Sequence, residues 1–339
     1  MRNRLQKYSS DHINLQYIVV GFLIIIQLVL GTEIEVHGNN ISQSNTVYKS
    51  NGLISVAFKY DTDLSMWIDF KSGGVNSIFG ISKISIKGTG RNSKDKVLKN
   101  NEKELKNNEK VLMNSTTDWI GPYMVKSNSD GNSNKAAFTG GWHGFNGDGT
   151  GAPTAKTISV SVLADDKKVE KNKTILCDKV RITVVNLVQG YNTKSSDGKG
   201  RPVLKETVYY NIEGNKIDVE TGIEALESIT IEKYYGLQTQ NSSWRDTVTY
   251  GDGKAINGYI NSTGQKISQY TLKGNGNVLT AWIDNEYELG KGEYVKGQAS
   301  AFTAAYGKSY FNLINGVNVH LEKGSVVNWK GGYIFAKEQ

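Results

Sequence analysis

The feature that most constrains the fold is a strict alternation of apolar and polar side chains over residues 216–225. Ile217, Val219 and Ile223 are apolar, and acidic residues stand between them. Successive side chains of a strand point to opposite faces, so this period of two predicts a β-strand with one buried face. The preceding segment, 207–212, is joined to it by a short Gly-containing turn. The two segments are therefore expected to form a hairpin.

The same rhythm recurs along the chain and predicts an all-β fold. Residues 157–163 alternate, with Ile158, Val160 and Val162 expected to point inward before a turn at 165–168. The chain holds 37 Gly and 18 Tyr, a composition that suits strands and turns better than helices. No alternation of strands with helices is visible, so we expect one large antiparallel β-sandwich of the super-sandwich or jelly-roll type. Further strands are expected at 180–184, 279–283, 317–321 and 326–335, with glycine turns at 274–276, 290–292 and 331–332.

One segment departs from the strand pattern. Residues 94–113 are strongly charged and contain a tandem repeat in which Leu98, Leu105 and Leu112 recur every seven residues. A coiled coil needs two apolar positions in each heptad, and this repeat supplies only one. We therefore predict a short, solvated, charged insertion in the sandwich domain.

The N-terminus predicts export. Arg2, Arg4 and Lys7 precede an uncharged apolar run at 17–30, which is the order of a secretory signal. The run is shorter than the roughly 20 residues that span a bilayer as a helix. Cleavage after Gly31 is therefore favoured over retention as an anchor. The resulting organisation is a signal peptide or anchor at 1–31, a polar linker at 32–51 and a sandwich domain at 52–339, in a secreted or cell-surface protein that contacts a membrane only through an uncleaved leader.

Charge and cysteine usage narrow the partners. The formal charge of +7 falls to +5 when three basic residues and one acidic residue of the leader are removed. This excess fits a Lys-rich soluble surface, and it also fits attraction to an anionic extracellular glycan. Nucleic acid is not expected as a partner, because no nucleic-acid-binding motif is present. Cys177 is the only cysteine, which excludes a disulfide framework and predicts a buried, inert thiol.

The first candidate site is the glycine-rich segment 138–154, which contains Trp142 and His143. Glycine allows a backbone to approach a ligand closely. Trp142 is a candidate ligand-binding residue because its ring can stack on a sugar, and His143 is a candidate catalytic base because histidine is the usual side chain for proton transfer in catalysis. The alternative is a purely structural loop in which Trp142 packs and His143 forms hydrogen bonds.

The second candidate site is the aromatic and amide-rich segment 234–246. Tyr234, Tyr235 and Arg245 are candidate catalytic residues. A polysaccharide lyase needs a base, an acid and a group that neutralises a uronate carboxylate, and His143, a tyrosine, and Arg245 or an amide supply these types. The alternative is that the tyrosines cap the core and Arg245 pairs with a neighbouring acid. Candidate ligand-binding residues are Gln238, Asn241, Trp244 and, in an earlier aromatic segment, Trp119.

No metal or other cofactor is expected. The chain has four histidines, and none stands at ligand spacing from another. Calcium has partial support from two strings of alternating Asn and Asp. Neither string has the downstream bidentate Glu of an EF-hand, and such strings commonly form plain turns. The two strings are Asn128, Asp130 and Asn132, and Asn146 with Asp148.

Residues 208–238 and the closing segment 329–335 (WKGGYIF) resemble the long β-sandwiches of the galactose-mutarotase-like superfamily, which includes polysaccharide lyase domains. Residues 139–154 are similar to Gly-rich segments of phage-tail and surface proteins of Gram-positive bacteria. Together these resemblances cover about half of the chain. They imply an exported protein that binds or acts on an extracellular polysaccharide. A polysaccharide lyase or hydrolase, and a structural surface or phage-tail-like protein, remain as alternatives.

Overall fold

The computed structural model describes residues 45–88, 109–131, 135–251, 255–256, 261–263 and 266–338. These residues belong to one compact unit, and the predicted leader at 1–31 lies outside them. Nearly all regular structure in the described part is β-strand, and one short 3-10 helix, η2 (Glu288–Lys291), interrupts it. No helix in these ranges is long and apolar enough to cross a membrane.

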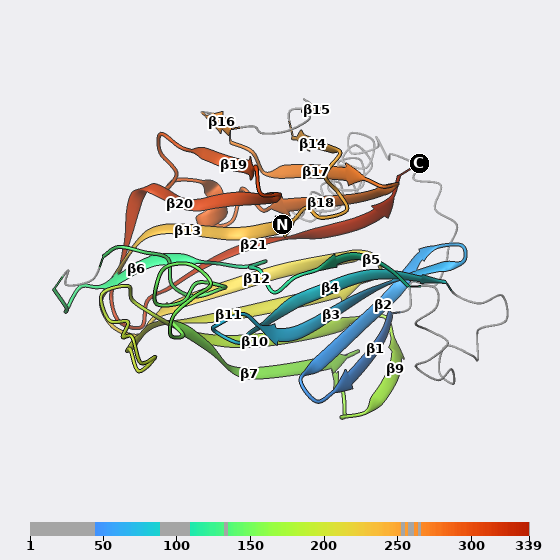
Figure 1. The fold of residues 1–339 in the computed structure, drawn as a ribbon, viewed down its shortest axis with the longest axis horizontal. Helices are drawn as coiled ribbons and strands as arrows, with labels where there is room; N and C mark the ends of the chain where they lie inside the picture. Colours follow the sequence, from blue (N-terminus) through green and yellow to red (C-terminus); the bar gives the residue numbers. More distant parts are fainter. Residues whose placement is uncertain are drawn as a thin grey trace, which may run out of the picture. The chain divides into compact units, whose positions relative to one another are not determined.

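Among the described residues, the largest sheet has ten strands, and every pair of neighbours in it is antiparallel (Figure 1). Its centre is the ladder β10, β11, β12 and β21, in which one face is buried. In spatial order the strands are β15 (Ala255–Ile256), β14 (Thr247–Tyr250), β17 (Gln269–Gly274), β18 (Asn277–Ile283), β21 (Val326–Lys337), β12 (Lys216–Ala225), β11 (Pro202–Glu213), β10 (Val180–Gln189), β7 (Ala155–Ala164) and β8 (Lys167–Lys168).

Two smaller antiparallel sheets complete the domain. The six-stranded sheet has the order β5 (Glu109–Asn114), β4 (Ile78–Gly88), β3 (Leu64–Gly73), β2 (Leu53–Asp61), β1 (Asn45–Ser50) and β9 (Lys173–Cys177). The five-stranded sheet has the order β16 (Asn261–Thr263), β19 (Ala299–Ala304), β20 (Lys308–Leu321), β13 (Ile229–Gln240) and β6 (Tyr123–Ser127).

Both smaller sheets pack on the same face of the large sheet. On β21, Trp329 donates a hydrogen bond to Tyr234 of the five-stranded sheet. Phe335 lies six positions after Trp329, and side chains an even number of positions apart are on the same face of a strand. It packs against Phe58 of the six-stranded sheet. Layers of sheet around a shared apolar core define a sandwich, so the predicted fold class is confirmed.

The strongest sequence pattern is reproduced closely. Lys216–Ala225 forms β12, and the hairpin with β11 closes at the pair Glu213 and Lys216. Ile217, Val219 and Ile223 are almost fully buried. Apolar burial at every second position explains both the strand and its register, since a shift by one residue would turn these side chains to solvent.

Two details of the strand prediction are corrected. Ile158 was expected to face the core, yet it is 52% exposed. The pairing of β7 with β10 skips Ile158, and such a bulge re-aims the side chain. Gly331 and Gly332 lie inside β21 and form no turn. Neighbouring backbone approaches both closely: an added Cβ would be 2.4 Å from the Trp282 carbonyl oxygen at the first and 2.3 Å from the Ile217 carbonyl oxygen at the second.

The predicted boundaries also move. The linker was placed at 32–51, but Asn45–Ser50 forms β1, which pairs with β2 and β9. Val47 is fully buried there, so the sheet includes part of the expected linker. The insertion was placed at 94–113, but Glu109–Asn114 forms β5 against β4, and Leu112 is buried. Residues 94–108 lie outside the described residues.

Candidate functional site

A cavity of about 480 Å³ opens on the side of the five-stranded sheet that faces away from the core. Alternation along the strands decides which side chains reach it. Tyr234 of β13 points into the core and Tyr235 points into the cavity, and on β20 Phe311 is buried while Lys308 and Tyr310 line the cavity. The other lining residues are Ser115, Thr116, Thr117, Asp118, Pro122, Phe138, Trp142, His143, Gln240 and Tyr306.

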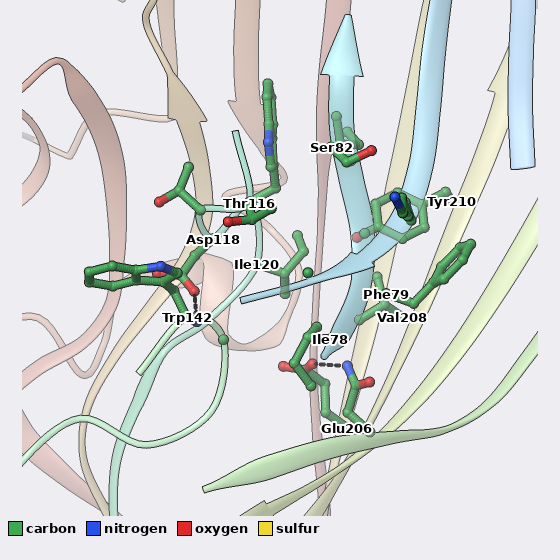
Figure 2. A pocket seen from close by; sticks show the side chains of 18 residues that line it. Ile78, Phe79, Ser82, Thr116, Asp118, Ile120, Trp142, Glu206, Val208 and Tyr210 are labelled. Atoms are coloured by element: carbon green, nitrogen blue, oxygen red, sulfur yellow. Dashed lines mark hydrogen bonds between the residues drawn. The ribbon is translucent and has the colours of Figure 1, made fainter. Parts of the chain in front are cut away.

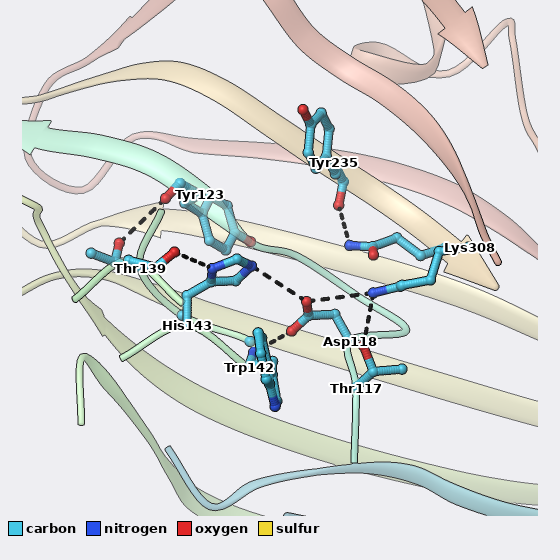
Figure 3. A network of polar contacts seen from close by, with 12 residues as sticks. Thr117, Asp118, Tyr123, Thr139, Trp142, His143, Tyr235 and Lys308 are labelled. Carbon is cyan, nitrogen blue, oxygen red and sulfur yellow. Dashed lines mark hydrogen bonds and ion pairs between the residues drawn. The ribbon is translucent and has the colours of Figure 1, made fainter. Parts of the chain in front are cut away.

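Asp118 is the centre of the polar part of the cavity (Figure 3). Its side chain is 3% exposed, and its Oδ2 lies 3.7 Å from Nε2 of His143 and 3.6 Å from Nζ of Lys308. Its Oδ1 accepts a hydrogen bond from the backbone N–H of Trp142. Nζ of Lys308 also donates to Oγ1 of Thr117 at 2.9 Å. A carboxylate, an imidazole and an ammonium thus meet at one wall of the cavity.

The glycine-rich loop takes its shape from two buried polar side chains. Gly141 has a φ of +50°, and a Cβ there would lie 2.1 Å from Oδ1 of Asp118, so only glycine lets the loop approach this carboxylate. Nδ2 of Asn76 donates to the carbonyl oxygens of Gly141 and His143, at 2.8 and 2.9 Å. Oδ1 of Asn76 accepts from the backbone N–H of Thr154 at 2.7 Å. These contacts fix the backbone on both sides of Trp142.

The hydrogen bond on one side of His143 determines which ring nitrogen is available for chemistry. Nδ1 lies 2.8 Å from the carbonyl oxygen of Gly147. A carbonyl oxygen only accepts hydrogen bonds, so Nδ1 carries a proton. The other ring nitrogen, Nε2, faces Asp118 in the cavity wall. This arrangement suits a group that moves a proton to or from a bound molecule.

Lys308 is unusual because a lysine is rarely buried. Its side chain is 9% exposed, and this burial lowers its pKa, although the nearby Asp118 carboxylate opposes the shift. Its Nζ also lies 5.3 Å from the centre of the Tyr310 ring. The ion pair with Asp118 offsets part of the cost of removing both charges from water.

Aromatic rings line much of the rest of the cavity. The Phe138 ring is 5.2 Å from the His143 ring and 5.2 Å from the Tyr235 ring, measured between centroids. Tyr235 is in turn 5.2 Å from Tyr310. Burial raises the pKa of Tyr235 to about 12, so its hydroxyl stays protonated at neutral pH and can donate a hydrogen bond. The cavity therefore combines apolar ring faces with a few convergent polar groups.

Of the predicted site residues, the structure brings together Trp142, His143 and Tyr235. Three predicted aromatic residues are corrected, because each lies in the core. Tyr234 stacks on Tyr123 with centroids 4.3 Å apart. Trp244 is 0% exposed and packs against Phe335, and Trp119 is 3% exposed and packs edge-on against Tyr333. Large rings in these strands and connecting segments fill the space between sheets instead of facing a ligand.

The three predicted polar residues of the second segment are also outside the cavity lining. Gln238 is fully buried, and its Nε2 donates to the Tyr235 carbonyl oxygen at 3.4 Å. Asn241 is 2% exposed, and its Nδ2 donates to Oγ of Ser309 at 3.0 Å. Arg245 is exposed and lies against Gly307, at the base of the β19–β20 turn. Lys308 lines the cavity, whereas Arg245 does not.

A second cluster of polar groups lies between the sheets, beside a small void of about 40 Å³ (Figure 2). Glu206 is its centre: Oε2 accepts from the Tyr123 hydroxyl at 2.5 Å and Oε1 accepts from Nδ2 of Asn186 at 2.8 Å. Burial raises the pKa of Glu206, and its two hydrogen bonds oppose the shift. The backbone of Tyr123 exchanges two hydrogen bonds with Thr139, so this cluster also supports the start of the glycine-rich loop.

The candidate calcium strings form ordinary loop contacts. Oδ1 of Asp148 accepts from the backbone N–H and the hydroxyl of Thr150, at 2.8 and 2.5 Å. Asp130 pairs with Arg201, and Asn132 lies outside the described residues. In the described ranges, no three His, Cys, Asp or Glu side chains are grouped as metal ligands. Cys177 is buried and free, and burial raises its thiol pKa to about 11, as expected of an inert thiol.

Sequence reasoning missed several residues of the cavity. Asp118 stands beside Trp119, and the sequence interpretation selected the aromatic residue of the two. Phe138 begins the glycine-rich segment without a distinguishing neighbour. A sequence signal was present at Lys308, Tyr310 and Asn312, which alternate with other side chains, among them Phe311 and Leu313. This alternation places the first three residues on one face of a strand and the two apolar residues on the other.

A scan against protein-family models found no match, and a search of curated proteins found none either. Solved structures do match. Galactose 1-epimerase from Lactobacillus acidophilus NCFM is 9% identical, with a TM-score of 0.41, over 88% of this chain and 100% of that chain. The Slr1438 protein from Synechocystis sp. PCC 6803 is 10% identical, with a TM-score of 0.36, over 89% and 100%. YeaD from Salmonella typhimurium, described as a mutarotase, is 9% identical, with a TM-score of 0.30, over 93% and 100%.

Proposed function

We propose that this protein binds a saccharide in the cavity beside Asp118. The observation that carries the proposal is the convergence of aromatic faces and paired polar groups in one space of about 480 Å³. Small-molecule sites typically are concave, are lined largely by apolar and aromatic side chains and contain a few placed polar groups. A sugar ring has an apolar C–H face and a rim of hydroxyls, so it matches both parts.

The aromatic part accounts for the apolar face of the sugar. Tyr235 and Tyr310 provide neighbouring rings 5.2 Å apart, and Phe138 extends this surface. Rings held by strands and by one another lose little conformational freedom on binding, which favours affinity. The Tyr235 hydroxyl, protonated at neutral pH, adds a hydrogen-bond donor at the edge of the surface.

The polar part accounts for the hydroxyls. Asp118 accepts hydrogen bonds, and Lys308 donates them from 3.6 Å away. A hydroxyl that sits near this pair can donate to the carboxylate and accept from the ammonium, and bonds to charged groups are the stronger ones. Together with the leader predicted at 1–31, this supports an extracellular polysaccharide as the source of the saccharide.

The test is a binding measurement with the purified protein against neutral and uronate-containing saccharides. Tyr235→Ala is expected to weaken binding roughly tenfold or more, which corresponds to about 1.4 kcal/mol. Tyr209→Ala is the matched control, because Tyr209 is a 36% exposed tyrosine of β11 that does not line the cavity. If no saccharide binds, or if both variants lose affinity equally, the proposal is wrong.

The second candidate is a lyase at the same cavity, favoured by the orientation of His143. Nε2 of His143 would take the proton next to a uronate carboxylate, and the C–H electrons would form a carbon–carbon double bond while the glycosidic oxygen departs. Tyr235 would give that oxygen a proton, and Lys308 would neutralise the carboxylate. Unsaturated ends should then appear as rising ultraviolet absorbance, and His143→Gln should abolish the rise. A flat trace with wild-type protein across uronate polymers that it binds would exclude this activity.

A further inference from the structure

The cavity is lined by a continuous series of aromatic rings. Beyond Tyr235 and Tyr310, the next ring is Tyr306, whose centroid is 6.4 Å from that of Tyr310. At the other end, the His143 ring is followed by the Trp142 ring, with centroids 5.8 Å apart. Six rings therefore follow one another in contact, in the order Tyr306, Tyr310, Tyr235, Phe138, His143 and Trp142.

The two ends of this series are the rings that solvent reaches. Tyr306 is 69% exposed and Trp142 is 39% exposed, whereas Tyr310 between them is 5% exposed. Trp and Tyr are enriched among the residues that carry binding energy, and these two belong to one continuous series of rings. Both end rings line the cavity together with the four rings between them.

Both end rings are held in place before any ligand arrives. The Tyr306 hydroxyl is 2.7 Å from the Tyr310 hydroxyl, and Tyr306 stands in the turn that Gly307 closes with a φ of +85°. The Trp142 ring lies against Gly149, where a Cβ would be 2.1 Å from Cζ2 of the indole, and its backbone N–H is bound by Asp118. Fixed platforms bind with a smaller entropic cost than mobile side chains.

We infer that the ligand is an extended oligosaccharide whose successive sugar rings lie along this series of aromatic rings, between Trp142 at one end and Tyr306 at the other. This inference rests on the proposed saccharide binding and adds its substrate class, a linear chain instead of a single sugar. Tyr306 is the new binding residue. It stands at one end of the series, so its contribution to affinity should grow with the length of the ligand.

The experiment measures affinity as a function of ligand length, with a monosaccharide and its linear oligomers of increasing length. Wild-type affinity should rise roughly tenfold or more between the monosaccharide and the longer oligomers. Tyr306→Ala should remove part of that rise, and it should lower the affinity for the longer oligomers by a larger factor than the affinity for the monosaccharide. Tyr306→Phe keeps the ring and should keep the rise, which separates ring stacking from the hydroxyl contact with Tyr310.

Tyr209→Ala again serves as the matched control for loss of an exposed tyrosine, and it should retain the full rise. Thermal unfolding of each variant establishes that the fold is intact. If the monosaccharide binds but affinity does not rise with length, or if Tyr306→Ala retains the whole rise, the inference is wrong and saccharide binding stands. If no saccharide of any length binds, the proposed function itself is wrong.

Discussion

Oδ2 of Asp118 lies 3.6 Å from Nζ of Lys308, and the two side chains are 3% and 9% exposed. The pair joins the segment before β6 to the start of β20, and it holds opposite charges at the wall of the cavity. Because both charged groups are buried, each charge is stabilised by the other. The free energy of unfolding should reflect this dependence.

Asp118→Asn leaves the Lys308 ammonium without its buried counter-charge, and removing one partner of such a pair costs about 3–5 kcal/mol of unfolding free energy. The amide oxygen of the substituted side chain can still accept the hydrogen bond from the Trp142 N–H. The loss of unfolding free energy therefore reports the missing charge. The double variant Asp118→Asn, Lys308→Met removes both charges and should recover part of the stability. Denaturant unfolding of the wild type, the double variant and the two single variants Asp118→Asn and Lys308→Met gives the coupling free energy. Additive losses would contradict the dependence.

The tryptophans Trp142 and Trp244 should behave in opposite ways. Trp244 is fully buried beside Phe335, so Trp244→Ala should destabilise the protein by about 3–5 kcal/mol. Trp142 is 39% exposed at the end of the series of rings, so Trp142→Ala should weaken oligosaccharide binding with a much smaller loss of stability. Denaturant unfolding and binding measurements on both variants separate the roles. A large stability loss in Trp142→Ala with unchanged binding would assign Trp142 to packing alone.

The neighbouring tyrosines Tyr234 and Tyr235 give a similar contrast through their hydroxyls. The Tyr234 hydroxyl accepts from Nε1 of Trp329 at 2.8 Å in the core. Tyr234→Phe leaves that buried N–H without its acceptor, which should cost about 1–3 kcal/mol of unfolding free energy. Tyr235→Phe removes a hydroxyl at the cavity and should affect saccharide binding more than stability. Equal stability losses in the two variants would mean that Tyr235 is also a structural residue.

Glu206 should make stability depend on pH. Its pKa is raised in the folded protein above the ordinary 4.5, chiefly by burial, so the folded state holds this proton more tightly than the unfolded chain. The stabilisation is fully present below about pH 4.5 and is lost as the pH rises through the folded pKa. Glu206→Gln lacks this titration. The free energy of unfolding of the wild type minus that of the variant should therefore decrease with rising pH, and a constant difference would refute the assignment.

Local pattern was sufficient wherever one buried face decides the structure. The alternation at 216–225 predicts β12 and its hairpin correctly, since apolar side chains at every second position can be buried only in that register. Ile158 shows the limit of this reasoning. It continues the alternating pattern, but a bulge in the pairing of β7 with β10 turns it outward, and the alternation of residue types contains no sign of that bulge.

The glycine-rich loop was recognised from sequence, because Trp142 and His143 among so many glycines are not required by regular structure. The second segment was assigned less accurately. Tyr234 and Tyr235 are equivalent in sequence, and only the packing of β13 between the core and the cavity separates their roles. The sequence suggested ligand binding for Trp244, Gln238 and Asn241, yet all three side chains are buried.

The sequence alone thus determined the strands, the antiparallel sandwich and one of the loops at the cavity, because these follow from side-chain periodicity and from the backbone freedom of glycine. The tertiary structure decided the site. Asp118, His143, Tyr235 and Lys308 come from four separate segments, and their meeting depends on how three sheets stack. No local pattern contains that information, because the distances between the segments are set by the packing of the whole core.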